Sequence, residues 1–280
     1  MRKLIRKIDA VAANDGDGVK INRIAGRQIN SVLDPFLMVD EINSDDAADY
    51  IGGFPEHPHR GFETITYMKA GRMRHRDHMG NEGVIEAGDV QWMTAGKGVL
   101  HSEMPEQSNG LLHGFQIWLN LPANEKMKPA AYRDIQSESV TELNLKQGGL
   151  VRVVAGNLKV DGVELAGPLP ELSTEPVMLD VVLNSTEPVE LEFNKHNTAL
   201  VYVYGGHLGE GGGGELKTHQ MGVFSKGETL KLQGGESGVK VLVFSGKSLN
   251  EPIAQYGPFV MNTVEEVEQA FQDYRQNKLV

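Results

Sequence analysis

Short apolar stretches with an alternating pattern recur along most of the chain, and helical periodicity is scarce. Alternation of apolar and polar residues over about four to eight positions is typical of strands with one buried face. Glycine, present 33 times, often stands in the breaks between these stretches, where it suits hairpin turns. We therefore expect an all-β chain whose clearest strands are GFETITYMKAG (61–71), DVQWMTAG (89–96), LLHGFQIWLNLP (111–122), ALVYVYGG (199–206) and GVKVLVFSG (238–246).

The C-terminal segment NTVEEVEQAFQDYRQ (262–276) is the exception to this pattern. Thr263 and Glu266 have the spacing of a capping box, which marks the start of a helix. Apolar residues follow at three- and four-residue spacing, at Val264, Val267, Phe271 and Tyr274. One amphipathic helix that packs on a sheet is expected here.

Two pairs of segments are similar to each other. YMKAG (67–71) resembles YVYGG (202–206), and GVIEAGD (83–89) resembles GVFSKGE (222–228), with offsets of 135 and 139 residues. An insertion in GEGGGGE (209–215) would reconcile the two offsets. This similarity predicts one β-unit used twice, with domains 1–133 and 134–280 and a Pro-rich, charged boundary near 121–134.

Composition excludes several classes of protein. The chain has no cysteine, which rules out disulfides, zinc fingers and iron–sulfur clusters. The net charge of −11 argues against direct binding of nucleic acid, and solubility is its simplest explanation. The N-terminal MRKLIRKIDA is basic but lacks the long apolar run of a signal peptide or membrane span. A cytoplasmic protein without membrane association is therefore expected.

Two histidine-containing pairs predict a metal site. His57 and His59 are two residues apart, as are His101 and Glu103, and side chains at i and i+2 of a strand point to the same face. Two such strands facing each other across a small barrel would bring together three imidazoles and one carboxylate. This ligand set suits one divalent first-row metal and leaves two coordination positions open.

The alternative is that these four residues are polar side chains on exposed strands, because alternation places polar residues at i and i+2 of any solvated face. The internal similarity favours the metal site. At the two offsets, the histidine and glutamate positions correspond to Glu192, Asn194, Lys240 and Leu242 in the second half. The second domain is thus expected to keep the scaffold and lack the ligand set.

Several longer motifs resemble those of the pirin family of the cupin superfamily. They are HPHRGFETITYMKAG (57–71), GDVQWMTAGKGVLHSEMP (88–105), DPFLMVDE (34–41) and YGPFVMNT (256–263). The resemblance implies a bicupin of two β-barrels with a single iron in the N-terminal barrel, held by His57, His59, His101 and Glu103. Glu63 takes the place of a ligand in the general cupin pattern; here we expect it to orient a histidine or structure the site rather than bind the metal.

Pirin-like proteins are associated with quercetin 2,3-dioxygenase activity, in which a flavonol ring is opened with release of carbon monoxide. By resemblance we predict this activity at Fe(II), with a flavonol-like substrate, O₂, and Glu103 as both ligand and base. Other first-row metals also suit the ligand set. The alternative function is an iron-dependent regulator that binds a protein partner connected with transcription, without turnover.

Other polar residues carry weaker signals. His75 and His78 lie among charges in RMRHRDHMG (72–80), which predicts a solvated hairpin. Alternation along 111–122 places His113 on the opposite face from Gln116 and Trp118, so that Gln116 either lines the barrel near the metal or packs in its wall.

Overall fold

Two compact units make up the computed structural model, which describes residues 1–169 and 172–280. The N-terminal unit comprises Val11–Ser31, Phe36–Ser137 and Asn250–Val280, and the C-terminal unit comprises Met1–Ala10, Val32–Pro35 and Glu138–Leu249. The chain thus changes from one unit to the other between Ser137 and Glu138, and residues 250–280 fold with the N-terminal unit. Nearly all regular structure is β, which confirms the all-β bicupin fold expected from the sequence.

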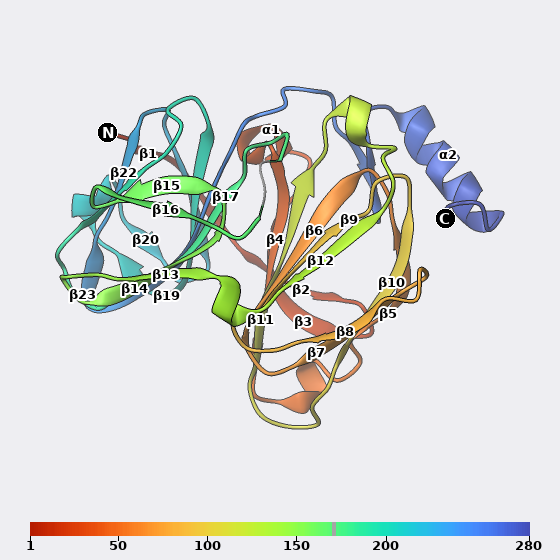
Figure 1. Ribbon diagram of the computed structural model, residues 1–280, viewed down its shortest axis with the longest axis horizontal. Coiled ribbons are helices and arrows are strands. Elements are labelled where there is room, and N and C mark those ends of the chain that lie inside the picture. Colours follow the sequence, from red (N-terminus) through yellow and green to blue (C-terminus); the bar gives the residue numbers. More distant parts are fainter. Residues whose placement is uncertain (170–171) are drawn as a thin grey trace. The chain divides into compact units, whose positions relative to one another are not determined.

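The N-terminal unit contains a large sheet, a small sheet and a hairpin (Figure 1). The large sheet has the order β12 (Ala131–Ile135), β9 (Val90–Thr94), β6 (Phe62–Ala70), β11 (Leu112–Asn120), β4 (Phe36–Ser44), β3 (Val19–Ala25) and β2 (Val11–Asp15). The small sheet has the order β5 (Phe54–His59), β10 (Val99–Pro105), β7 (Met73–Asp77) and β8 (Glu82–Ile85), and the hairpin is β24 (Ala254–Tyr256) with β25 (Phe259–Met261).

The C-terminal unit repeats this plan. Its large sheet has the order β1 (Leu4–Asp9), β21 (Gln220–Phe224), β19 (Thr198–Leu208), β23 (Gly234–Gly246), β17 (Val177–Leu183), β14 (Gly149–Ala155) and β13 (Thr141–Asn144), with β20 (Leu216–Lys217) beside β19. Its small sheet has the order β16 (Val163–Ala166), β15 (Asn157–Val160), β18 (Val189–Glu192) and β22 (Thr229–Leu232). Among the residues that the structure describes, the short helices of the two units are α1 (Asn30–Leu33) and four 3₁₀ turns, at Ala47–Asp49, Ala123–Glu125, Ser137–Ser139 and Glu210–Gly212.

The two large sheets correspond strand by strand, which confirms the predicted duplication. One of the two sequence matches was nevertheless wrong. It paired β8 of a small sheet with β21 of a large sheet, whereas the strand order pairs β9 with β21 and β10 with β22. Lys240 and Leu242 lie on β23, so they are not the counterparts of His101 and Glu103; the counterpart strand is Thr229–Leu232. The hairpin β7–β8 has no equivalent in the order of the other small sheet, and this breaks the simple offset.

The interiors of the two barrels differ. In the C-terminal unit, buried aliphatic side chains from both sheets form one large core, including Val153, Leu179, Leu191, Val201 and Leu230. In the N-terminal unit, the corresponding apolar cluster is smaller and includes Ile21, Ile42, Met68 and Leu112, all four of which come from the large sheet. The same scaffold therefore builds one filled barrel and one that keeps space inside.

Helix α2 (Val264–Arg275) ends the chain close to its predicted position (Figure 1). Thr263 and Glu266 form the predicted capping box. Val267 and Ala270 are buried, and Phe271 packs against Phe259 of β25 with ring centroids 4.8 Å apart. Val264 does not join this face: it lies in the first turn and is 62% exposed. Within the described residues, no helix is long and apolar enough to cross a membrane.

Candidate metal centre

The strands that carry the histidines are direct neighbours in the small sheet. β5 and β10 are antiparallel, with His101 opposite His57 and Val99 opposite His59. The sequence predicted two strands that face each other across the barrel, and this was wrong. The result is nevertheless the same convergence, because residues opposite each other in an antiparallel pair project to one face.

Three imidazoles meet on that face. The ring centroids of His57 and His101 are 4.4 Å apart, and those of His59 lie 4.7 Å from His57 and 5.0 Å from His101. One ring nitrogen from each histidine can be chosen so that all lie within 4.8 Å of one another. Nitrogens that share a first-row ion at about 2.1 Å are separated by about 3 to 3.5 Å. The cluster is thus close to the size that such an ion requires.

The hydrogen bonds of His57 and His59 direct one nitrogen of each ring toward this point. Nδ1 of His57 lies 2.8 Å from the carbonyl oxygen of Pro55, and Nδ1 of His59 lies 3.4 Å from that of Pro258. When Nδ1 carries the proton in both rings, the two Nε2 lone pairs face each other at 3.0 Å. Such lone pairs repel each other unless a cation lies between them, so the arrangement fits a metal ion.

His101 gives independent support for a cation-binding role of the cluster. The residue is 1% exposed, and neither of its ring nitrogens has a hydrogen-bond partner among residues 1–169 and 172–280. Burial lowers the pKa of both His101 and His59 well below its usual range, and the neighbouring histidines lower it further. Both rings are therefore neutral at physiological pH, the form in which imidazole binds a metal.

Glu103 lies beside the histidines but makes a different contact. A register shift between His101 and Glu103 places Glu103 opposite Phe54 of β5. Its carboxylate oxygen Oε1 is 3.0 Å from the hydroxyl of Thr66, and the residue is 5% exposed. Burial raises the pKa of Glu103, against the opposing effects of His57 and Thr66. Its role as a ligand remains a prediction, because the close cluster consists of the three histidines.

Glu63 points away from the histidines. Its carboxylate accepts a hydrogen bond from Thr94 (2.7 Å) and lies 3.4 Å from Nζ of Lys128. On one unbroken strand, Glu63 would face the same way as His57 and His59, but β5 ends at His59 and β6 begins at Phe62, with Gly61 at φ +91° between them. The alternation restarts there, so that Thr66 faces the cavity and Glu63 faces the other side.

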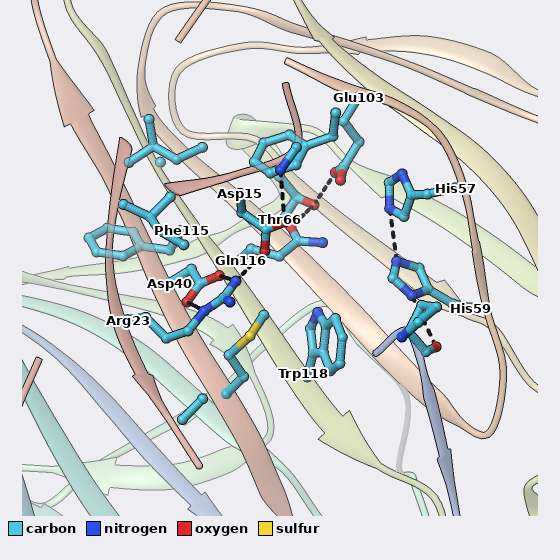
Figure 2. Close-up of a pocket in the computed structure, with 18 of the residues that line it drawn as sticks. Asp15, Arg23, Asp40, His57, His59, Thr66, Glu103, Phe115, Gln116 and Trp118 are labelled. Carbon is cyan, nitrogen blue, oxygen red and sulfur yellow. Dashed lines mark hydrogen bonds and ion pairs between the residues drawn. The ribbon is translucent and has the colours of Figure 1, made fainter. Parts of the chain in front are cut away.

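A cavity of about 1030 Å³ opens beside the histidines (Figure 2). Figure 2 shows His57 and His59 on one side of it, with Arg23 and Asp40 on the other. Trp118 lies between them, and its ring centroid is 5.3 Å from that of His59. Gln116 lines the cavity, which agrees with the first of the two alternatives predicted for it, that it lines the barrel interior. A volume of this size accommodates a flat, drug-sized molecule.

Comparison with known proteins places this barrel in a family. The model described as pirin matches residues 18–119, and the model described as the pirin C-terminal cupin domain matches residues 178–280. The chain belongs to the pirin family. It is 35% identical to rat pirin over 270 residues, which is 95% of this chain and 89% of that protein.

Two further relatives of this pirin-family chain have names that concern activity. A Vibrio cholerae protein named "Putative quercetin 2,3-dioxygenase" is 46% identical over 273 residues, covering 98% of this chain and 96% of the relative. The crystal structure of a quercetin 2,3-dioxygenase from Acinetobacter baumannii has a TM-score of 0.90 and 32% identity, covering 100% of this chain and 98% of the other.

The pirin-family barrel also contains polar residues that the sequence analysis missed or misplaced. His75 is completely buried on β7, opposite Glu103 of β10, and stacks on Tyr132 with ring centroids 4.2 Å apart. The solvated hairpin predicted there was wrong for His75, although His78 is exposed. The cavity wall also contains the half-buried Arg23 and the buried Asp40. The sequence contained a sign of both residues, because each is a charged residue at an inward-facing position of a strand whose neighbouring inward-facing residues are apolar.

Lys126 anchors the segment behind the histidines. Its buried ammonium donates to the carbonyl oxygens of Gly61 (2.8 Å) and Val260 (3.1 Å) and to Oδ1 of Asn120 (2.6 Å). Burial lowers the pKa of Lys126 to about 8, so the side chain is still mostly protonated at neutral pH. These bonds join the β5–β6 connection to the C-terminal hairpin that supplies the Pro258 carbonyl.

Lys126→Ala is expected to destabilise the N-terminal unit by about 3 kcal/mol, because three acceptors lose their donor and a buried stem is removed. The midpoint of urea unfolding, followed by circular dichroism, measures this change. Lys97→Ala is the matched control: Lys97 is exposed, and its loss should change stability by less than about 0.5 kcal/mol. Equal midpoints for the two variants would contradict the anchoring role.

Proposed function

We propose that the chain is a metal-dependent dioxygenase that opens the heterocyclic ring of a flavonol such as quercetin, with O₂ as co-substrate and carbon monoxide as a product. The proposed ion is Fe(II), held by His57, His59, His101 and Glu103. The convergence of one ring nitrogen from each of the three histidines carries this proposal. The names of the Vibrio and Acinetobacter relatives support the reaction class.

A bound divalent ion would supply Lewis acidity and electron transfer between the substrate oxygen and O₂. The protein side chains orient the metal ligands and position the substrate. The carbonyls of Pro55 and Pro258 hold the Nδ1 protons of His57 and His59, which fixes both rings for binding through Nε2. Trp118 offers a flat surface beside the histidines against which an aromatic ring can lie.

Glu103 is the proposed base for the flavonol hydroxyl. Its carboxylate lines the same cavity as His57 and His59, within reach of the Thr66 hydroxyl. Because burial raises its pKa, the ionised carboxylate has a higher affinity for a proton than an exposed glutamate has. Thr66 can hold the carboxylate in position while the substrate hydroxyl approaches.

The test is anaerobic loading with Fe(II), followed by addition of quercetin and O₂, with carbon monoxide and loss of the quercetin absorption as readouts. Turnover is expected in the wild type and should be lost in His57→Ala. Metal bound in stoichiometric amount without turnover would reject the dioxygenase and favour the regulatory alternative, in which the same site serves a protein partner.

Replacing each of the two glutamates by glutamine, in separate variants, distinguishes their roles. Glu103→Gln is expected to lower kcat by about 100-fold or more, because it removes both the base and an anionic ligand. Glu63→Gln should retain turnover within about threefold, because that carboxylate contacts Thr94 and Lys128 outside the cavity wall. Metal content is measured for both variants. Loss of metal and activity in Glu63→Gln alone would reverse the assignment.

A further inference from the structure

A row of polar side chains crosses the inner face of the large sheet in the N-terminal unit. Arg23 lies opposite Asp40, Asp40 opposite Gln116, Gln116 opposite Thr66, and Thr66 opposite Gln91. Register partners project to the same side of a sheet, so the row runs continuously across β3, β4, β11, β6 and β9. Arg23, Asp40, Gln116 and Thr66 line the cavity.

The fold itself does not need this row. In the C-terminal unit, the corresponding strands β14, β17, β23 and β19 carry Val153, Leu179, Val243 and Val201 as successive register partners. The next inward row, Val151, Val181, Val241 and Val203, is aliphatic as well. The C-terminal barrel thus fills its inward-facing rows with aliphatic side chains. Folding of such a barrel therefore does not by itself explain the polar row in the N-terminal barrel.

The charged end of the row is Arg23 with Asp40 and Asp15. Nε of Arg23 is 2.8 Å from Oδ1 of Asp40 and Nη2 is 2.6 Å from Oδ2, while Nη2 also contacts Asp15. The Asp40 side chain is 7% exposed. Burying an ion pair in a barrel costs desolvation energy that aliphatic side chains avoid. Within the described residues, Nη1 of Arg23 has no hydrogen-bond partner, so it can still donate into the cavity.

The chemistry of this group defines what it would recognise. Two ionised carboxylates and one guanidinium carry a net negative charge, so they accept hydrogen bonds from neutral hydroxyl groups and disfavour an anionic substituent. Nη1 of Arg23 can donate to the oxygen of the same hydroxyl. Figure 2 shows Arg23 and Asp40 of this group across the cavity from His57 and His59, with Gln116, Thr66 and Trp118 between.

We propose that Arg23, Asp40 and Asp15 form a specificity site that binds the hydroxyl groups of the substrate remote from the histidines. The inference rests on the proposed function and narrows it: the substrate class is a flat, neutral aromatic compound with hydroxyl groups at the end opposite its metal-binding oxygens. The site selects by the presence of those remote hydroxyls and takes no part in the ring opening.

Two flavonols test this. Quercetin carries remote hydroxyls, and 3-hydroxyflavone keeps the 3-hydroxyl and 4-carbonyl but lacks them. Dissociation constants are measured anaerobically on metal-loaded protein by quenching of tryptophan fluorescence. The wild type should bind quercetin about tenfold or more tightly than 3-hydroxyflavone. In Arg23→Val/Asp40→Leu, which imitates the C-terminal barrel, this preference should fall to about twofold or less, with 3-hydroxyflavone binding unchanged.

The outcomes separate the two proposals. Absence of binding of both flavonols to the wild type would overturn the proposed function together with this inference. Wild-type binding and ring opening with a preference that persists in Arg23→Val/Asp40→Leu would overturn the inference alone. If the double variant fails to fold, Asp15→Asn decides, because the Asp15 side chain is 47% exposed and tolerates the change. That variant should lose about threefold of the preference, and an unchanged preference would overturn the inference.

Discussion

His101→Leu is expected to be at least as stable as the wild type without metal and less stable than the wild type with it. In the metal-free protein, the buried imidazole of His101 lacks hydrogen-bond partners among the described residues. A buried unpaired polar group costs about 1–3 kcal/mol, and leucine of similar volume removes that cost. With metal at 100 times its Kd, the wild type gains about 2.7 kcal/mol that the variant cannot gain.

Urea unfolding measures both stabilities. The metal-free stability is measured after treatment with a chelator, and the metal-bound stability after loading with Ni(II) or Fe(II). Metal analysis of the loaded proteins gives the stoichiometry, expected to be one per chain in the wild type. His196→Leu is the control, since His196 is an exposed histidine of the C-terminal unit and should leave the metal response intact. A metal-dependent gain in His101→Leu equal to that of the wild type would exclude His101 as a ligand.

The histidine cluster could be predicted from the sequence because its geometry is local. His57 and His59 share a face through the two-residue period of one strand, and His101 belongs to a short strand with the same period. Only one long-range fact was needed, namely that the two strands meet. That they are neighbours in one sheet rather than opposite walls of the barrel was not visible, because both arrangements give the same periodicity.

Glu63 shows where sequence periodicity ends. Its separation from His59 is even, and on one strand the two side chains would face the same way. The turn at Gly61 separates two strands that belong to different sheets, and such a turn resets the relation between sequence spacing and direction. A strand pattern therefore predicts which way side chains face only up to a glycine at which the chain turns from one sheet into another.

The polar row and the C-terminal anchor depend on long-range contacts. Arg23 and Asp40 were visible as charged residues within apolar alternations, but their partnership requires the register of β3 with β4. The contacts of His59 with Pro258 and of Lys126 with Val260 join residues far apart in the sequence. In the sequence, residues 250–280 follow the second domain, and nothing local indicates that they complete the first.

Gly61→Ala is expected to destabilise the N-terminal unit by on the order of 4–5 kcal/mol and to weaken metal binding. At φ +91°, a residue with a Cβ carries about 1–2 kcal/mol of strain. In addition, the new Cβ would lie 1.9 Å from the carbonyl oxygen of Val260, a backbone atom that cannot rotate away. Val260 would have to move, and its hydrogen bonds with Arg60 and Lys126 would be lost.

Gly80→Ala is the matched control. Gly80 has nearly the same backbone conformation, φ +85°, and a Cβ there would meet nothing within 4 Å in the described part of the chain. Its cost should be the conformational strain alone, about 1–2 kcal/mol, with the metal content unchanged. The difference between the two variants in urea unfolding therefore isolates the clash with Val260. Because the displaced hairpin also carries the Pro258 carbonyl that orients His59, Gly61→Ala should lower metal affinity as well as stability. Equal costs in the two variants, or full metal affinity in Gly61→Ala, would show that the C-terminal hairpin does not hold the histidine site in place.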